Sequence, residues 1–207
     1  SFPYEPAYLA TLLRELLPED TVLITGVGIR HAVGQHFPFL KERTQIVGSG
    51  FGTMGQEVAA PIGVRLARPD TPVVGLVGDG AVMACLAALP TAVAAGLHIV
   101  WLVVNNTGYA SIAVYQAKHF GRHAGTYFRS VDGSAYEPDY VSLARSVGAQ
   151  AERITDPEEF PELLATALNN PATWVLELPV TPTPRVLASG HWDVNDILAA
   201  GTKSENR

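Results

Sequence analysis

Hydrophobic and polar positions follow two periodicities along this chain, one typical of helices and the other of buried strands. Helical spacing of apolar side chains predicts helices over residues 5–17, 55–67, 81–95, 138–147 and 157–168. Short apolar runs predict interior strands over residues 21–25, 45–47, 73–77, 97–104 and 174–178. The predicted fold is therefore α/β: a doubly wound, mostly parallel six-stranded sheet with helices on both faces.

Two stretches carry more detailed expectations. Residues 81–95 are apolar on most sides, which predicts a buried helix that Pro90 kinks or ends in its first part. Residues 109–133 lose regular periodicity and are rich in aromatic and polar side chains, which is typical of a loop that shapes a pocket. The candidates for substrate-side residues in this loop are Tyr115, Gln116, His119 and His123. Taken singly, a residue of each of these types is more commonly exposed or structural.

Composition indicates a globular protein with a large core, since 47% of the 207 residues are hydrophobic and 16% are charged. We expect one domain over residues 1–180 and an extended arm over residues 181–207, in which Trp192 hints at a docking segment. The formal net charge is −6, and the 14 Lys and Arg residues are scattered. This balance argues against a nucleic-acid partner and favours small molecules or proteins.

Cysteine usage and hydropathy bear on the compartment. Cys85 is the single cysteine and lies in an apolar helical run, so we expect a buried, inert thiol rather than a nucleophile. A signal peptide is not expected, because the sequence lacks a charged start followed by an apolar core. A membrane-spanning helix is not expected either, because apolar runs are interrupted before they reach about 18 residues. The expectation is a cytoplasmic protein with no membrane partner.

Two polar motifs follow the predicted strands 73–77 and 97–104. Asp79 lies in Gly78-Asp79-Gly80 after the first strand, and Asn106 follows the second. Neighbouring parallel strands end at the same edge of a sheet, so these side chains should lie close together. A carboxylate and an amide oxygen suit Mg²⁺, and backbone N–H groups beside glycines suit phosphate oxygens. The pair predicts a metal-bridged diphosphate, although either motif alone would be read as a helix cap or a turn.

Two further glycine-rich loops could face the same ligand. Gly26-Val27-Gly28 follows the predicted strand 21–25, and Arg30 and His31 come next, either facing an anion or simply solvated. Residues 48–55 contain four glycines together with Phe51 and Met54. A linker is usually polar, so this second loop is better explained as a ligand-facing segment.

These motifs together resemble the C-terminal diphosphate-binding domain of thiamine-diphosphate enzymes of the acetolactate synthase, benzoylformate decarboxylase and pyruvate oxidase group. Asp79 and Asn106 stand at the separation that this family has, and the resemblance runs from about residue 8 to 179. It implies that Asp79, Asn106 and the carbonyl of Gly108 bind Mg²⁺. It also implies that Gly80 and Ala81 contact the diphosphate through backbone groups.

Residues 50–55 resemble the upstream element of the same family. By this resemblance Met54 is the apolar wedge that holds the cofactor bent, and the Gly52 carbonyl accepts a hydrogen bond from the cofactor's 4′-amino group. The alternative is that Met54 is an ordinary core residue. Ile29 departs from the polar residue that is usual in the family's other diphosphate loop, so Arg30 or backbone groups must bind there. The remaining implied cofactor contacts are Gly28, Thr53, Gly78 and Tyr109.

Other departures concern the helix after Met54 and the missing catalytic acid. Glu57 stands where the family has a small or apolar residue, and it could face substrate or begin the helix. No glutamate of the chain matches the one that activates the cofactor from a pyrimidine-binding domain. The resemblance to split sulfopyruvate and phosphonopyruvate decarboxylases then implies a pyrimidine-binding partner subunit that carries this acid, in an α2β2 heterotetramer.

The expected function is that of the diphosphate-binding subunit of a decarboxylase or carboligase that acts on a small 2-oxo acid with thiamine diphosphate and Mg²⁺. A first alternative is a subunit of a 2-hydroxyacyl-CoA lyase, which would cleave a carbon–carbon bond of an acyl-CoA substrate. A second alternative is a non-catalytic cofactor-binding subunit. The intact Asp79, Asn106 and Met54 argue against this last reading.

Overall fold

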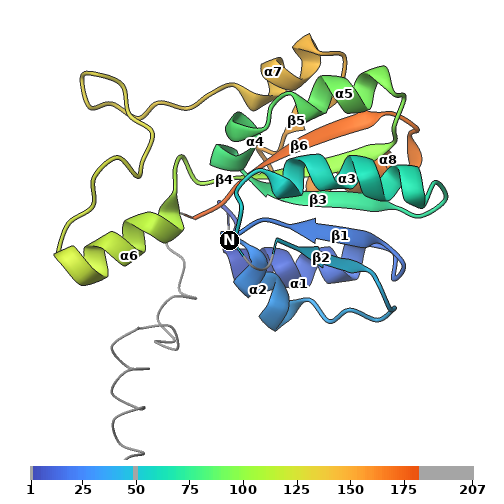
Figure 1. Ribbon diagram of the computed structural model, residues 1–207, viewed down its shortest axis with the longest axis horizontal. Helices are drawn as coiled ribbons and strands as arrows, with labels where there is room; N and C mark the ends of the chain where they lie inside the picture. Colours follow the sequence, from blue (N-terminus) through green and yellow to red (C-terminus); the bar gives the residue numbers. More distant parts are fainter. Residues whose placement is uncertain (1, 49–50, 182–207) are drawn as a thin grey trace, which may run out of the picture.

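A sheet of six parallel strands forms the centre of the molecule in the computed structural model, which describes residues 2–48 and 51–181 (Figure 1). The strand order is β2-β1-β3-β4-β6-β5. The strands are β1 (Val22–Thr25), β2 (Gln45–Val47), β3 (Val73–Gly78), β4 (Ile99–Asn105), β5 (Gln150–Arg153) and β6 (Thr173–Pro179). The predicted doubly wound α/β fold is confirmed.

Helices cover both faces of this sheet, which explains why β3 and β4 are apolar at nearly every position. One face packs on α1 (Pro6–Leu16), α2 (Arg30–His36) and α8 (Phe160–Asn169). The other face packs on α3 (Gln56–Ala67), α4 (Asp79–Ala84), α5 (Ala88–Ala94) and α7 (Tyr140–Ser146). The remaining helix, α6 (Ala110–Phe120), stands away from both layers (Figure 1).

The strand order places a crevice at the carboxyl ends of β1 and β3. The chain runs from β1 to β2 at one edge and then returns to β3 on the other side of β1. In a doubly wound sheet the loops diverge at such a switch point and leave room for a ligand. The loops after β1, β3 and β4 therefore meet at one place.

The predicted helix over residues 81–95 is interrupted, as the expected effect of Pro90 requires, but not at Pro90 itself. The chain forms α4 and α5 instead, and the break at residues 85–87 precedes Pro90, which lies in the first turn of α5. Proline lacks an N–H and clashes with the turn before it, so it is tolerated in a first turn but not in the middle of a helix. The break leaves Cys85 only partly buried, where a buried thiol was expected.

The prediction of an irregular loop is wrong for the first part of residues 109–133, which forms α6, whereas residues 121–133 contain no helix or named strand. Small side chains at Ala110 and Ala113 form the buried face of α6, and the exposed aromatic residues obscured that spacing. Two short elements were missed altogether. β5 is a four-residue edge strand with one buried residue, and α2 has seven residues, so neither has a clear apolar pattern.

The predicted arm at 181–207 lies almost wholly outside the described residues, as does Trp192. Within residues 2–48 and 51–181, no helix combines the length and the apolar character needed to cross a membrane.

Candidate functional site

Asp79 is a buried acidic residue at the carboxyl edge of the sheet, with 2% of its surface exposed. It is the first residue of α4 and directly follows β3. Its Oδ1 accepts a hydrogen bond from the N–H of Gly80 at 2.7 Å, and its Oδ2 accepts one from Asn106 at 3.2 Å and one from Gly108 at 3.0 Å. The carboxylate thus joins the ends of β3 and β4, as the sequence predicts.

Burial raises the pKa of the Asp79 carboxyl, while the N–H groups of Gly80, Gly108 and Asn106 oppose the rise. No ion pair among the described residues includes Asp79. A buried carboxylate without a cationic partner is costly unless a proton or a metal ion compensates it. The environment of Asp79 therefore suits a bound cation.

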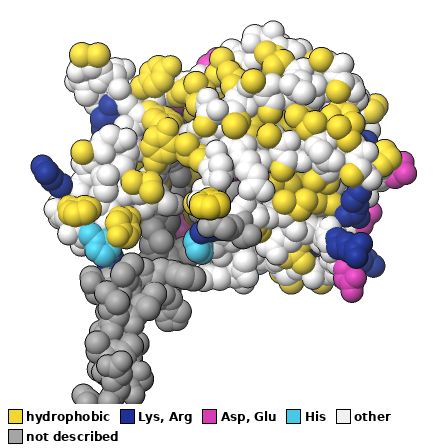
Figure 2. Space-filling view, in the orientation of Figure 1, with side chains coloured by type: hydrophobic (Ala, Val, Ile, Leu, Met, Phe, Trp, Pro, Cys, Tyr) yellow, Lys and Arg dark blue, Asp and Glu magenta, His cyan; other side chains and the backbone are white. Residues whose placement is uncertain are grey.

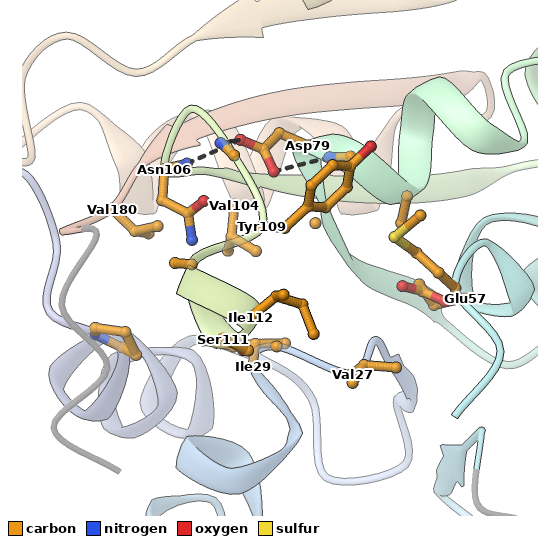
Figure 3. A pocket seen from close by; sticks show the side chains of 18 of the residues that line it. Val27, Ile29, Glu57, Asp79, Val104, Asn106, Tyr109, Ser111, Ile112 and Val180 are labelled. Carbon is orange, nitrogen blue, oxygen red and sulfur yellow. Dashed lines mark hydrogen bonds between the residues drawn. The ribbon is translucent and has the colours of Figure 1, made fainter. Parts of the chain in front are cut away.

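Asn106 supplies the second oxygen. Its side-chain Oδ1 is buried and has no hydrogen-bond partner among the described residues. Unpartnered buried oxygens are uncommon in folded proteins and call for a ligand, an ion or water. The close-up in Figure 3 shows the Asn106 side chain beside the Asp79 corner. A carboxylate, an amide oxygen and a nearby backbone carbonyl at Gly108 form an all-oxygen donor set, which fits Mg²⁺.

Two glycines at this corner are required by close packing. A Cβ at Gly80 would overlap the ring of Tyr109, and a Cβ at Gly108 would overlap the backbone carbonyl of Thr126. The N–H of Tyr109 donates to that same carbonyl at 2.6 Å. The turn after β4 is therefore held against the strand-like segment 126–128, and Tyr109 closes over the start of α4.

A cavity of about 230 Å³ opens beside this corner (Figure 3). It is lined by residues from the loops after β1, β3 and β4, from the Gly52–Met54 segment and from α6. Pockets that enclose a whole drug-sized ligand usually measure about 300–1,000 Å³. The described residues thus provide part of a ligand site rather than a closed one.

Most of the predicted cofactor residues line this cavity. They are Gly28, Ile29, Gly52, Met54, Gly78, Asp79, Gly80, Ala81, Asn106, Gly108 and Tyr109. Arg30 and Thr53 are not among the lining residues. Arg30 begins α2, so its role at a diphosphate stays a prediction.

None of the predicted substrate-side residues lines the cavity. Tyr115 packs on His119 with ring centroids 4.3 Å apart, and the side chain of Gln116 accepts the N–H of Ala124 at 2.8 Å. His123 lies 3.3 Å from the Thr126 hydroxyl. These contacts are structural, and they fall on α6 and the segment after it.

The cavity also contains residues that the sequence reasoning missed. Ser111 and Ile112 come from the unrecognised first turn of α6. Pro6 and Val180 are brought there by a bridge in which Tyr4 pairs with Val180. The helical spacing of Ala110 and Ala113 could have revealed the first pair. The second pair depends on contacts between the two ends of the domain, for which the sequence carries no local pattern.

Glu57, in the first turn of α3, lines the cavity as well. It is 4% exposed, and its Oε2 accepts the N–H of Gly55 at 3.1 Å. Burial raises the pKa of its carboxyl. Glu57 was expected either to begin the helix or to face substrate. The bond to Gly55 fits a residue at the helix start, and contact with substrate stays a prediction.

The Gly52–Met54 side of the cavity is open. Met54 is 42% exposed and the preceding Phe51 is fully exposed. Figure 2 shows hydrophobic side chains gathered between the α6 segment and the main body. Ile112, which also lines the cavity, is 53% exposed. Apolar groups of this size around a cavity are typical of a surface that another molecule covers.

A cavity at the switch point of a parallel sheet, with paired buried oxygens and close-packed glycines, defines a nucleotide- or diphosphate-binding type of α/β domain. Comparison with known proteins narrows this class. The family described as thiamine pyrophosphate enzyme, C-terminal thiamine pyrophosphate-binding domain, matches residues 26–178. The chain belongs to this family. Its cofactor is thiamine diphosphate, with Mg²⁺ as the usual partner of that cofactor in the family.

Curated relatives carry the same domain within longer proteins. The mitochondrial acetolactate synthase catalytic subunit of Aspergillus candidus is 31% identical over 163 residues, which are 77% of this chain and 22% of that protein. The 3D-(3,5/4)-trihydroxycyclohexane-1,2-dione hydrolase of Bacillus velezensis is 28% identical over 203 residues, 94% of this chain and 31% of that protein. The chain therefore spans less than a third of these relatives.

Solved structures share the fold. A thiamine diphosphate-dependent 4-hydroxybenzoylformate decarboxylase of Rhodococcus jostii RHA1 aligns with a TM-score of 0.77 at 23% identity, over 86% of this chain and 32% of that one. Benzoylformate decarboxylase of Polynucleobacter necessarius aligns with a TM-score of 0.79 at 21% identity, over 88% of this chain and 34% of that one. At these identities the likeness shows the fold alone.

Proposed function

We propose that this chain is the diphosphate-binding part of a thiamine-diphosphate enzyme that decarboxylates a 2-oxo acid or joins it to an acceptor. The observation that carries the proposal is the pair of buried oxygens at Asp79 and Asn106. One is a carboxylate without a cationic partner, and the other is an amide oxygen without any partner among the described residues. A domain that had lost cofactor binding would have no physical reason to keep both.

The roles of the residues follow from their places around the cavity. Asp79, the side chain of Asn106 and the carbonyl of Gly108 hold Mg²⁺. Backbone groups of Gly80 and Ala81, at the start of α4, face the diphosphate. Four of the remaining proposed contacts line the cavity: Gly28, Ile29, Gly78 and Tyr109. The other two, Arg30 and Thr53, are next to lining residues in the sequence.

The other end of the cofactor belongs to the Gly52–Met54 segment. Gly52 has a φ of 60°, a conformation that glycine adopts without strain. Its carbonyl is the proposed acceptor of a hydrogen bond from the aminopyrimidine. Met54 is unbranched and fills the bend between the two rings. The bound cofactor supplies the electron sink for breaking or forming a bond at the substrate carbonyl. The residues of this chain bind it, bend it and exclude water on one side.

The exposed face beside Met54 supports a second element of the proposal, which is a pyrimidine-binding partner. Phe51, Met54 and Ile112 leave apolar surface around the cavity uncovered by the described residues. A partner domain placed there would complete the cavity and contribute the carboxylic acid that activates the cofactor. We propose that this partner is a separate subunit, in an α2β2 assembly.

A second candidate substrate comes from the Bacillus velezensis relative, whose match extends over 94% of this chain. The acetolactate synthase match covers 77%. A hydrolase of a cyclic 1,2-dione is therefore worth testing beside 2-oxo acid chemistry. Both reactions act on a carbonyl group next to a second oxidised carbon, so the proposed cofactor site serves either.

Cofactor binding is tested first. Titration of the full chain with thiamine diphosphate by calorimetry, with and without Mg²⁺, should show binding that requires the metal. Thiamine without the diphosphate should bind far more weakly, because the proposed contacts are to the diphosphate and the metal. Equal affinity for both compounds, or binding independent of Mg²⁺, would contradict the proposed site.

Activity is tested by adding a pyrimidine-binding domain. Candidates are the product of a neighbouring gene and the isolated pyrimidine domain of an acetolactate synthase. We expect CO₂ release from one of a panel of 2-oxo acids, or ring opening of a cyclic 1,2-dione, only when both components are present. Turnover by the 207-residue chain alone would overturn the requirement for a partner.

A further inference from the structure

The turn that carries the proposed metal ligands is fixed from two sides. Asp79 accepts the N–H groups of Asn106 and Gly108. The N–H between them, on Thr107, instead donates to the side-chain oxygen of Asn105 at 2.9 Å. Three successive N–H groups are therefore bound alternately by Asp79 and Asn105. Only Asp79 is itself a proposed ligand.

Thr107 needs such an anchor. Its φ is 58°, in the left-handed region that β-branched residues rarely adopt. A residue held in this conformation is strained and persists only where surrounding contacts fix it. The bond from Asn105 acts on this residue directly, and the turn at Thr107 sets the direction of the Asn106 side chain and the Gly108 carbonyl.

Asn105 is in turn fixed by two carboxylates. Its Nδ2 donates to Glu177 at 2.7 Å and to Glu137 at 2.8 Å. Both N–H bonds of the amide are thus used by acidic acceptors, and the oxygen can only face the Thr107 N–H. Asn105 is 4% exposed and Glu177 is 1% exposed, so water competes little with these bonds.

Strand register explains how the carboxylates reach this place. Glu177 lies in β6 between Val103 of β4 and Arg153 of β5. Asn105 is two residues beyond Val103, on the same face of the sheet. Arg153 forms ion pairs with Glu137 at 2.8 Å and with Glu177 at 3.4 Å, which offsets the repulsion between the two acids.

Glu137 also links this network to the segment that contains α6. That segment leaves the turn at Tyr109 and touches it again where the N–H of Phe128 donates to the Thr107 carbonyl at 3.0 Å. It meets the network a third time at Glu137. The hydrogen bonds of Asn105 with Glu137, Glu177 and Thr107 therefore fix the turn at residues 106–108 relative to α6. The first residues of α6 line the cavity.

We propose that Asn105, held by Glu177 and Glu137, is a positioning residue that aims the oxygens of Asn106 and Gly108 at the metal. This inference rests on the proposed function, because that function assigns the metal to these oxygens. Asn105 does not touch the cofactor. It acts through the conformation of Thr107.

The test compares Asn105→Ala with Asn169→Ala, which removes a similar side-chain bond, to the Ala165 carbonyl, on distant α8. The first readout is hydrogen exchange of the amides of residues 106–108 by NMR, in the chain without metal or cofactor. We expect exchange of the Thr107 amide to speed up in Asn105→Ala and to stay unchanged in Asn169→Ala.

The second readout is the Mg²⁺ concentration that half-saturates thiamine diphosphate binding. Residues that orient metal ligands typically change metal affinity by about 10–100-fold, so we expect a rise of that size in Asn105→Ala. Unchanged exchange and a Mg²⁺ requirement within about twofold of the parent would overturn the positioning role. Failure of the parent chain to bind the cofactor at all would instead refute the proposed function, and the exchange readout would still test the anchor.

A milder pair of variants decides the matter if Asn105→Ala does not fold. Glu137 and Glu152 are both partly exposed, and each pairs with an arginine in the same polar groove. Glu137→Ala should raise the Mg²⁺ requirement and speed exchange at Thr107, whereas Glu152→Ala should do neither. Equal behaviour of these two variants would contradict the proposal.

Discussion

The two ends of the proposed cofactor site are built in different ways. At the Asp79 end, backbone N–H groups of Gly80, Asn106 and Gly108 converge on one buried carboxylate, and glycines allow close packing. At the Gly52–Met54 end, the side chain that is proposed to touch the cofactor is 42% exposed. The described residues bury the first end of the proposed site, whereas they leave the second as an open surface.

In the proposed site, the Asp79 end anchors the cofactor, and the Gly52–Met54 end takes part in its activation. Metal and diphosphate binding requires several oxygens held in fixed positions, which a strand edge provides by backbone geometry. Bending the cofactor requires apolar surface on both sides, and the described residues supply only one. Mutations at the two ends should therefore have different effects.

The largest expected effect is at the anchored end. Asp79→Asn removes a negative charge from the proposed metal site and should weaken Mg²⁺-dependent binding of thiamine diphosphate by at least about 100-fold, measured by calorimetry. The matched control is Asp139→Asn, because Asp139 caps α7 at the surface and asparagine can accept the same bond from Ser142. Unchanged affinity in a folded Asp79→Asn variant would remove Asp79 from the metal site.

At the open end the expected loss concerns turnover rather than affinity. Met54→Ala should lower kcat of the complex with a pyrimidine-binding domain by about 10–100-fold, because a small misplacement of reacting groups has effects of that size. Binding of diphosphate and metal should change less than about threefold. Met83→Ala is the control, since Met83 is 41% exposed on α4 and does not line the cavity. Equal losses in both variants would contradict the wedge role.

The tight packing around Gly108, at the Asp79 end, should contribute to the stability of the folded chain. Gly108→Ala places a Cβ against the Thr126 carbonyl and the Tyr127 backbone, which cannot move easily. We expect a loss of about 1–3 kcal/mol in the free energy of unfolding, measured by urea denaturation. Gly34→Ala in α2 meets no neighbouring atom and should be neutral or slightly stabilising. A Gly108→Ala variant as stable as the parent would show that the turn has room to relax.

The smallest expected effect is a pH trend at Glu57. Burial raises the pKa of its carboxyl in the folded chain above the value of about 4.3 expected in the unfolded chain. The folded chain therefore binds more protons between the two pKa values, and its stability falls as the pH rises through that window. Glu57→Gln removes this titration, and the Gln side chain keeps an oxygen for the Gly55 N–H.

Urea denaturation of the parent chain and Glu57→Gln at pH 4.5, 5.5 and 7.0 measures the trend. The free energy of unfolding of the parent, relative to the variant, should decrease as the pH rises. A relative stability that increases with pH would mean that a cation near Glu57 outweighs its burial. Such a result would favour the alternative in which Glu57 faces a charged ligand.

Much of this molecule could be predicted from local patterns. The runs that became β3 and β4 are apolar throughout, because strands covered on both faces have no solvated side. Asp79 and Asn106 follow these strands directly, so parallel pairing alone brings them together. The elements that were missed or misread lack such patterns: β5 is a short edge strand, and α6 has exposed aromatic residues beside a narrow buried face of small ones.

The sequence by itself thus determined five of the six strands, the pairing of Asp79 with Asn106 and the family resemblance, because each depends on residues close together in the chain or on two neighbouring strands. Tertiary structure alone decided which other contacts fix the turn that carries the proposed metal ligands. Asn105 meets Glu137 and Glu177, from distant parts of the chain, and Tyr4 meets Val180 from opposite ends of the domain. No periodicity encodes such meetings, because they depend on strand order and on how loops return to the sheet.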